Sequence, residues 1–376
     1  MESTAPAAPP YVVRPFTLRP FRALMLAASG IGDPASARAF ARPYREVAAR
    51  LATWEVDGRL RRDDVPALYV HEYTSDGITV RGVVGALELA QTSASCPDGE
   101  QAIYPHEGVH ERQVTELALR MGQMQINPAP ILLVHRGPAH VRRLLDRITA
   151  RQPDLVFSDR AEQVHRLWSI RHDPELSDVR DALTTTRALI ADGHHRYAAY
   201  LRLQQEHPGT AWDRGLVMLV DQSDTPLWLG PIHRTLTGVT LADLLDACAA
   251  RDDVTCWTTS RYDALEELGD HVLVLSDGAQ WAVLRLEDTD HLAVTSLQAE
   301  LLPAWGVPPE SISFHHTAAE ALTRARTRGG VAVLMPAPAF DQVVDSASAG
   351  RLLPEKATSF QPKPSLGVLM RVLRDE

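Results

Sequence analysis

The sequence predicts a mixed α/β fold with a large N-terminal unit followed by a smaller α/β unit. The chain has 376 residues, which is long for a single compact core. Short apolar runs, typical of buried strands, alternate with longer segments in which apolar residues recur at helical spacing. The pattern changes near Thr240, where a leucine-rich helical segment begins. We therefore expect a first unit over residues 1–236, a smaller unit over 237–345 and a C-terminal tail over 346–376.

The first unit is expected to contain paired strands and amphipathic helices. Ser75-Asp76-Gly77 is a turn sequence between two strand-like runs, which predicts that the two runs pair. The expected strands are 66–73, 78–89, 130–134, 164–170, 188–190 and 216–220. Helices are expected at 138–151 and 177–183, after His110 as far as Met124, and after Gly193 as far as Leu203.

The second unit shows a similar alternation over a shorter length. Helices are expected at 241–249, 297–302 and 317–327, and strands at 272–275, 281–286 and 331–335. The apolar residues near the C-terminus predict a last helix from Leu366 to Leu373.

Composition limits the classes of partner. The formal net charge of −10 argues against a broad nucleic-acid surface or an anionic membrane as the main partner. The cysteines are Cys96, Cys248 and Cys256, and their spacing indicates neither a disulfide framework nor a cysteine zinc site. The N-terminal residues do not read as a signal peptide, and no apolar stretch is long enough to span a bilayer. A reducing cytoplasm is the expected compartment.

The highest concentration of potentially catalytic side chains is in Asp192-Gly193-His194-His195-Arg196, which follows an apolar run. Gly193 permits a tight turn between the expected strand and the following helix. Free backbone N–H groups at a helix start attract anions, and a guanidinium such as that of Arg196 suits phosphate. One such histidine alone would more simply be a hydrogen-bonded structural residue. A carboxylate, two imidazoles and a guanidinium in one turn indicate a functional site.

A second polar stretch, His106-Glu107-Gly108-Val109-His110, matches the pattern HExxH. In a helix this pattern would place two histidines one turn apart to bind zinc, with Glu107 activating water. Pro105 and Gly108 disfavour a helix here, and no third ligand follows at standard spacing. A zinc hydrolase remains an alternative, as does a simple helix start with Glu107 near the positive end of the dipole.

Glu107 and Asp192 together suggest phosphoryl transfer. One carboxylate could accept a proton while the other holds Mg²⁺ against phosphate oxygens. The sequence has neither a GxxxxGK[ST] loop nor a kinase-type glycine loop. The tail residues Lys356, Thr358 and Lys363 could contact phosphate or belong to a solvated terminus.

The motifs also carry a family resemblance. Pro105-His106-Glu107 and the DGHHR string at 192–196 look like the signatures of a widespread bacterial family of about this length. The stretch from Pro354 to Lys363 resembles that family's terminal Pro-Pro-Lys-Ser-Thr-x-Phe-x-Pro-Lys signature, so the likeness extends nearly end to end. The paired motifs are also similar to those of ParB/sulfiredoxin-like free-serine kinases. This resemblance implies a ParB/sulfiredoxin-like catalytic core with elaborations.

In those kinases the glutamate acts as base on the serine hydroxyl and the DGHHR loop handles nucleotide phosphates. At matching positions, the resemblance implies catalytic roles for Glu107, Asp192 and His194, with Asp192 as the metal- or phosphate-positioning carboxylate. It further implies nucleotide or phosphate contacts from His106, Gly193, His195, Arg196, Lys356, Thr358 and Lys363.

This chain departs from the family pattern at five positions. After the HE step the family tends to carry a lysine and an Asp-Arg pair, where this chain has Val114, Glu116 and Leu117. In the terminal signature, Glu355 replaces proline and Ala357 replaces serine. These departures suggest a specialised relative with a changed substrate, a changed phosphate donor or no kinase activity.

The leading interpretation is a cytoplasmic phosphotransferase. It would move a phosphoryl group from ATP or ADP, with Mg²⁺, to the hydroxyl of free serine or a similar small amino acid. Its partners would be that amino acid and a nucleotide, with no nucleic acid and no membrane. A noncatalytic regulator that binds a nucleotide or phospho-metabolite in the same pocket is the alternative from a different class. The zinc hydrolase that uses His106, Glu107 and His110 is the third.

Overall fold

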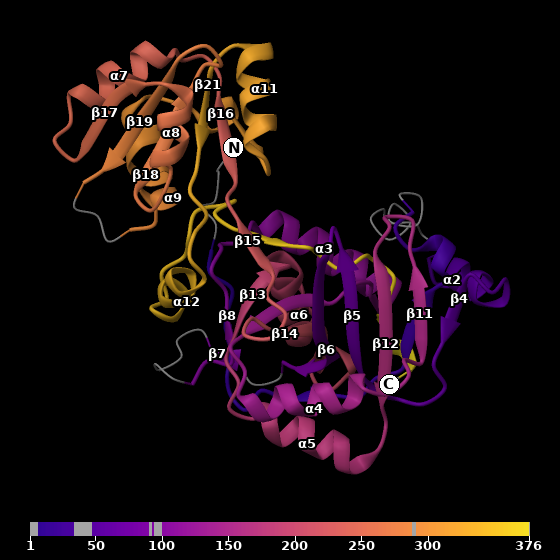
Figure 1. Cartoon of the computed structure of the whole chain (residues 1–376). Coiled ribbons are helices and arrows are strands. Elements are labelled where there is room, and N and C mark those ends of the chain that lie inside the picture. The colour runs from indigo at the N-terminus through magenta and orange to yellow at the C-terminus, as the bar shows by residue number, and fades with distance from the viewer. Residues whose placement is uncertain (1–6, 34–46, 90–91, 94–99, 288–290, 376) are drawn as a thin grey trace. The chain divides into compact units, whose positions relative to one another are not determined.

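A computed structural model describes residues 7–33, 47–89, 92–93, 100–287 and 291–375. The chain divides into two compact units. The first comprises residues 1–227 and 362–376, and the second comprises Trp228–Gln361 (Figure 1). Cys96 lies outside the described residues, and Cys248 and Cys256 are free thiols. Within the described ranges, no helix combines the length and the apolar character needed to cross a membrane.

The first unit is built on a large mixed sheet. In the described part of the chain this sheet has nine strands in the order β11-β12-β5-β6-β14-β10-β13-β8, with β2 paired to β6. Most neighbours are antiparallel, but β10 runs parallel to β14, and β13 runs parallel to β8. The strands are β2 (Leu18–Arg19), β5 (Leu68–Ser75), β6 (Ile78–Glu88), β8 (Ile103–Tyr104), β10 (Ile131–His135), β11 (Leu155–Ser158), β12 (Val164–Ile170), β13 (Ala188–Asp192) and β14 (Arg214–Asp221).

The predicted hairpin at residues 75–77 is confirmed, because β5 and β6 pair antiparallel up to Ser75 and Ile78. The predicted strands at 130–134, 164–170, 188–190 and 216–220 are confirmed as β10, β12, β13 and β14. The predicted mixed α/β class is therefore confirmed.

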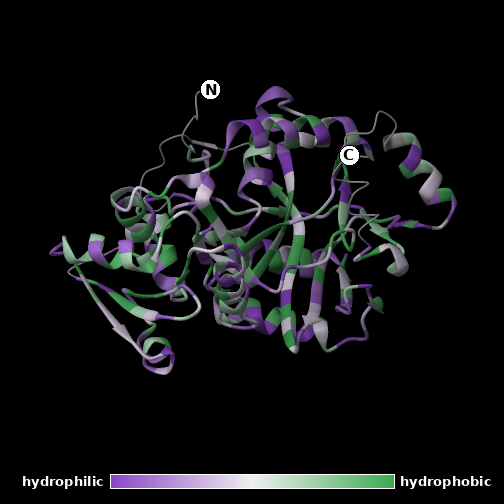
Figure 2. Cartoon of the chain, turned by 90° about the horizontal axis from the view of Figure 1, so that it is seen from above, coloured by the Kyte–Doolittle hydropathy of each residue, from purple (hydrophilic) through white to green (hydrophobic). Residues whose placement is uncertain are grey.

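Four of the five described helices of the first unit pack in two pairs. The five are α2 (Val47–Val56), α3 (Glu111–Met124), α4 (Ala139–Thr149), α5 (Asp173–Leu183) and α6 (His194–Glu206), with short 3₁₀ turns at Ala28–Gly30, Ala211–Asp213 and Leu373–Asp375. Helix α3 packs against α6, and α4 lies beside α5 (Figure 1). Helices α3, α4 and α5 each have a buried and an exposed face, whereas α6 is exposed only at its last two residues, and Figure 2 shows both green and purple stretches along the helices. The core combines these buried faces with the inner strands, including Ile131, Leu133, Ile190, Val217 and Leu219.

The C-terminus forms a strand, so the predicted helix from Leu366 to Leu373 is wrong. Strand β23 (Met370–Val372) lies between β3 (Ala23–Leu26) and β9 (Ile126–Asn127), and β4 (Leu60–Arg62) completes that sheet. Gly367 has φ +89°, which lies far from the negative φ of an α-helix, so the backbone is not helical at this residue. A strand buried on both faces has the same apolar composition as a buried helix. The run of apolar residues near the C-terminus therefore could not distinguish the two structures. A further ribbon pairs β1 (Tyr11–Val12) with β7 (Thr92–Ser93).

The second unit contains an antiparallel sheet whose described strands run in the order β17-β19-β18-β21-β16-β20. Its strands are β16 (His233–Leu236), β17 (Val254–Thr259), β18 (Val272–Ser276), β19 (Trp281–Leu286), β20 (Ile312–His315) and β21 (Val331–Leu334), and a separate ribbon pairs β15 (Trp228–Gly230) with β22 (Ser359–Gln361). Its helical segments are α7 (Leu241–Ala249), α8 (Arg261–Glu267), α9 (Ala293–Ser296), η3 (Leu297–Leu301), α10 (Leu302–Ala304), η4 (Pro309–Ser311), α11 (Ala318–Arg328) and α12 (Phe340–Ser348).

The helices at 241–249 and 317–327 were predicted and are confirmed as α7 and α11. Each begins with a capping box, formed by Thr240 with Asp243 and by Thr317 with Glu320. In both cases the threonine oxygen accepts a backbone N–H that has no partner inside the helix, which fixes where the helix starts.

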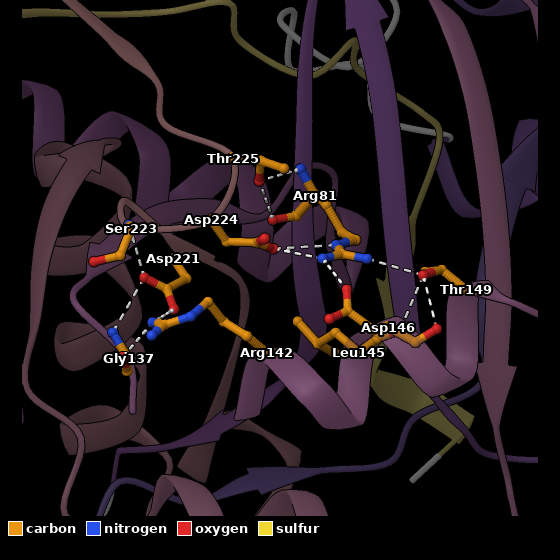
Figure 3. Close-up of polar contacts among 10 residues, drawn as sticks. All are labelled: Arg81, Gly137, Arg142, Leu145, Asp146, Thr149, Asp221, Ser223, Asp224 and Thr225. Atoms are coloured by element: carbon orange, nitrogen blue, oxygen red, sulfur yellow. Dashed lines mark hydrogen bonds and ion pairs between the residues drawn. The ribbon is translucent and has the colours of Figure 1, made fainter. Parts of the chain in front are cut away.

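Two arginine-centred groups hold the loops at one end of the large sheet (Figure 3). Arg81 donates to Asp224 at 2.6 Å, to Asp146 at 2.8 Å and to Thr149 at 2.9 Å. Asp221 accepts from Arg142 at 2.9 Å. Because His135 pairs with Asp221 at the end of β10 while Leu132 pairs with Asp192 near its start, this cluster lies at the opposite end of β10 from the DGHHR motif.

Candidate active site

The DGHHR motif forms the junction between β13 and α6. Asp192 ends the strand, and Gly193 is the residue before the helix, with φ +101°. A Cβ on Gly193 would lie 2.9 Å from the Nη2 atom of Arg196, so a side chain there would displace the guanidinium. The predicted strand, turn and helix are all present in this order.

Asp192 is contacted by two cationic groups. Arg196 Nη2 lies 2.5 Å from one carboxylate oxygen, and Lys363 Nζ contacts the other. Burial opposes ionisation of Asp192, but Arg196 and Lys363 outweigh it and hold the pKa of this carboxyl below its ordinary value. Arg196 is fixed in turn by a 2.7 Å hydrogen bond to the Pro130 carbonyl.

The two cationic contacts of Asp192 affect whether this residue could bind the expected magnesium ion. Both oxygens of Asp192 are already engaged, so Asp192 could bind Mg²⁺ only if a cationic side chain moved away. No group of three His, Cys, Asp or Glu side chains in the described residues could hold a metal ion. The side chains present therefore do not form a ready site for a resident metal, whereas the cationic groups suit an anionic ligand.

The histidines of the motif connect it to the HE stretch. His194 Nε2 accepts a hydrogen bond from the backbone N–H of His106 at 3.3 Å, and the two rings meet edge to face with centroids 4.5 Å apart. His195 Nε2 accepts from the backbone N–H of His110 at 3.1 Å. The start of α6 thus holds both ends of the 106–110 segment.

His194 is neutral and faces Glu107. Burial lowers the pKa of His194 well below its ordinary value, and the neighbouring His106, His195 and Lys363 lower it further. Because Nε2 accepts the His106 N–H, the ring proton lies on Nδ1. That Nδ1 is 3.9 Å from Glu107 Oε2, which is close but longer than a hydrogen bond. The side chain of Glu107 is 21% exposed, so it is accessible to a ligand.

The HE stretch is extended, and α3 begins only at Glu111. His106 and His110 are therefore not one helical turn apart, and the geometry required by the zinc HExxH pattern is absent. The ring of His106 is fully buried, and its burial lowers the pKa to about 3 despite a hydrogen bond with the Ile190 backbone. His106 is thus held as a neutral residue beneath the site.

The tail residues fall in different units. Lys363 belongs to the first unit and contacts Asp192, whereas Lys356 and Thr358 belong to the second unit. Within that unit, the Lys356 carbonyl accepts a hydrogen bond from Arg234. The departures Glu355 and Ala357 also belong to the second unit, and Ala357 is buried there.

The departures on α3 have clear local environments. Val114 is 4% exposed and packs into the core of the first unit. Glu116 forms ion pairs with Arg112 and Arg120 along the helix, at 3.2 and 3.6 Å. Leu117 packs against the same core as Val114.

Sequence reasoning missed the residues that hold Lys363 in place. Tyr73 donates a 2.7 Å hydrogen bond to the Pro362 carbonyl, and Gln163 Nε2 donates a 3.0 Å hydrogen bond to the Lys363 carbonyl. Burial raises the pKa of Tyr73, and the nearby Asp192 raises it further. The alternation along 66–73 could have placed Tyr73 on the buried face of its strand, but no pattern links it to the C-terminal segment.

Comparison with known proteins identifies the family. The chain belongs to the family described as "Protein of unknown function (DUF1015)", which it matches over residues 17–304. This confirms the predicted membership of an uncharacterised family. A search of curated proteins found no match.

Several solved structures are similar at low identity. They include SbnI with a C-terminal truncation from Staphylococcus aureus (12% identity, TM-score 0.42, covering 72% of this chain and 84% of that chain). A mutant of a free serine kinase in complex with ADP has 14% identity and a TM-score of 0.40, covering 71% of this chain and 89% of the other. A conserved hypothetical protein from Pyrococcus furiosus has 15% identity and a TM-score of 0.40, covering 73% and 93%.

Proposed function

We propose that this protein is a phosphotransferase that moves a phosphoryl group from ATP or ADP to the hydroxyl of free serine or a similar small amino acid. The observation that carries this proposal is the link between the two motifs. His194 and His195 hold the 106–110 segment against the start of α6, and Glu107 Oε2 lies 3.9 Å from Nδ1 of His194, a residue of the motif that also carries Asp192 and Arg196. A proton acceptor next to an anion-binding helix start is what this reaction requires.

Each residue has a defined task in the proposed step. Glu107 accepts the proton of the acceptor hydroxyl, whose oxygen then forms a bond to the terminal phosphorus of the nucleotide. The bond between that phosphorus and the bridging oxygen breaks, and the shortened nucleotide leaves with the electron pair. His194 holds the segment that carries Glu107 through its hydrogen bond with the His106 backbone N–H, so His194 is a positioning residue.

Lys363 and the start of α6 supply the phosphate contacts. The side chain of Lys363 is 48% exposed and bends onto Asp192, so it can turn toward a bound phosphate. Asp192 holds Arg196 and Lys363 in place when no ligand is bound. Mg²⁺ would neutralise phosphate charge as part of the nucleotide complex.

A noncatalytic regulator is the second candidate, and α3 favours it. The resemblance places a lysine and an arginine where this chain has Val114 and Leu117, and here Val114 is buried and Leu117 packs against the same core. If the missing basic groups were needed for transfer, the same pocket would bind a nucleotide without turnover.

Phosphorus NMR distinguishes the two candidates. The purified full chain is incubated with Mg²⁺, ATP or ADP, and a pool of hydroxyl amino acids, beside a Glu107→Gln variant. A new phosphomonoester signal that is absent from the variant supports the transferase. Saturable nucleotide binding with no new signal supports the regulator, and absence of nucleotide binding contradicts both.

A further inference from the structure

The second unit contains a pocket with a buried guanidinium. The pocket lies between the start of β16, the loop before β18, helix α9 and the loop that follows β21, and it is partly open to solvent. Arg234 and His271 contribute polar groups to its wall, and Met335, Pro336, Pro338 and Val294 contribute apolar ones. All of these residues belong to the second unit. The proposed phosphotransferase uses none of them.

Arg234 is buried without a carboxylate partner. Its side chain is 1% exposed, and no described Asp or Glu forms an ion pair with it. The Phe314 ring, with its centroid 5.4 Å from the guanidinium carbon, is the aromatic group that faces the charge. Burial lowers the pKa of Arg234 to about 10, so the group is still cationic at neutral pH. A buried charge with no counter-ion is unfavourable unless a ligand neutralises it.

The hydrogen bonds of Arg234 engage both Nη atoms and leave Nε without a partner in the described residues. Nη1 donates to the Ile232 carbonyl, and Nη2 donates to the Lys356 carbonyl at 3.0 Å. Nε is buried and has no partner among the residues that the structure describes. An Nε–H and an adjacent Nη–H form a planar fork, and this fork matches the two oxygens of a carboxylate.

His271 provides a second unused group. Its Nδ1 is buried without a partner in the described residues, and its backbone has φ +61°, which is uncommon for a residue other than glycine. Asp270, the preceding residue, also lines the pocket and is exposed to solvent. Its negative charge disfavours a ligand with two negative charges, such as phosphate, more than a ligand with one.

We propose that this pocket binds a small monocarboxylate. The carboxylate would meet Nε of Arg234 and Nδ1 of His271, and the carbon chain would contact Met335 and the prolines. The carboxylate could belong to a free amino acid, whose ammonium group would face Asp270, or to an unsubstituted acid. The proposal stands on the second unit alone, so it does not depend on phosphoryl transfer in the first.

Calorimetry on the full chain tests this site. The probes are propionate, L-alanine, their neutral analogues propionamide and L-alaninamide, and inorganic phosphate. We expect at least one of the two carboxylates to bind, its amide to fail, and phosphate to bind more weakly. Preference for L-alanine assigns an amino acid, and preference for propionate assigns an unsubstituted acid. Equal binding of acid and amide, tighter binding of phosphate, or no binding of either carboxylate overturns the proposal.

Two variants and a control locate the site. Arg234→Gln should weaken carboxylate binding by roughly 30-fold or more, because a buried charged partner is lost. Arg328→Gln removes an exposed arginine of α11 and should leave binding unchanged. Asp270→Asn, at the exposed position, should tighten propionate binding about two-fold or more, since a like charge is removed.

Hydrogen–deuterium exchange of the wild-type chain supplies a readout that does not depend on the folding of any variant. Saturating carboxylate should slow exchange in segments 232–236, 270–273 and 335–338. Protection confined to other segments contradicts the site, as does undiminished binding by folded Arg234→Gln.

Discussion

His194 Nδ1 lies 3.9 Å from Glu107 Oε2, while Nε2 of the same ring accepts the backbone N–H of His106. One imidazole thereby fixes the segment that carries Glu107 and lies close to its carboxylate. The two residues are far apart in sequence, so this relationship exists only in the folded chain. It is the structural basis of the proposed role of Glu107.

Replacement of His194 should impair catalysis more than binding. His194→Gln removes the ring that holds the segment carrying Glu107, and we expect kcat to fall by about 100-fold, as for a misplaced catalytic group. The dissociation constant of the nucleotide should change little, because Lys363 and Arg196 remain. Steady-state kinetics and fluorescence titration measure the two quantities separately. An equal loss in affinity and in turnover would show that His194 acts on binding instead.

Gly193 should tolerate no side chain. Gly193→Ala places a Cβ 2.9 Å from Arg196 in a backbone with φ +101°, and we expect a loss of about 1–3 kcal/mol in the free energy of unfolding and weaker nucleotide binding. Gly209→Ala is the matched control, since Gly209 also has positive φ (+77°) but has nothing within 4 Å of its Cβ position. Urea unfolding should show the smaller loss for Gly209→Ala, with nucleotide affinity unchanged. Equal effects of the two substitutions on affinity would refute the role of Gly193.

Acid should destabilise the first unit through its buried histidines. Burial lowers the pKa of His106 from 6.5 to about 3 and that of His135 to about 4. The unfolded chain therefore binds more protons between pH 6.5 and these values, so the free energy of unfolding falls as pH falls through that range. Each buried neutral histidine adds up to about 1.4 kcal/mol per pH unit. His106→Gln should flatten this slope by up to one proton in denaturant titrations at several pH values, and an unchanged slope would contradict the assignment.

The Arg81 cluster should contribute to stability without affecting the proposed site. The side chain of Arg81 is 9% exposed and bonds Asp224 and Asp146, so Arg81→Met should cost about 1–3 kcal/mol by leaving these acceptors unpaired. Arg19→Met is the control, because the Arg19–Glu88 pair is 51% and 33% exposed and its loss should cost less than about 1 kcal/mol. Nucleotide affinity should be unchanged in both folded variants. A fall in affinity for Arg81→Met would mean that this end of the sheet communicates with the motif.

Much of the fold could be predicted from local patterns, and part of the site could not. The predicted ranges 241–249, 281–286 and 164–170 coincide with α7, β19 and β12, because their apolar spacing and flanking residues are unambiguous. The predicted C-terminal helix failed because β23 is buried between two strands, which periodicity cannot distinguish from a buried helix. The bonds from His106 to His194 and from Tyr73 to Pro362 join residues separated by 88 and 289 positions, and no local pattern encodes such contacts.

The most direct test of the central claim compares wild type with Glu107→Gln in the same phosphoryl-transfer reaction, with nucleotide affinity measured in parallel. If Glu107 accepts the proton of the acceptor hydroxyl, the variant should bind nucleotide as wild type does and form phosphomonoester at least about 100-fold more slowly. Equal rates of product formation by the two proteins would show that Glu107 is not the base.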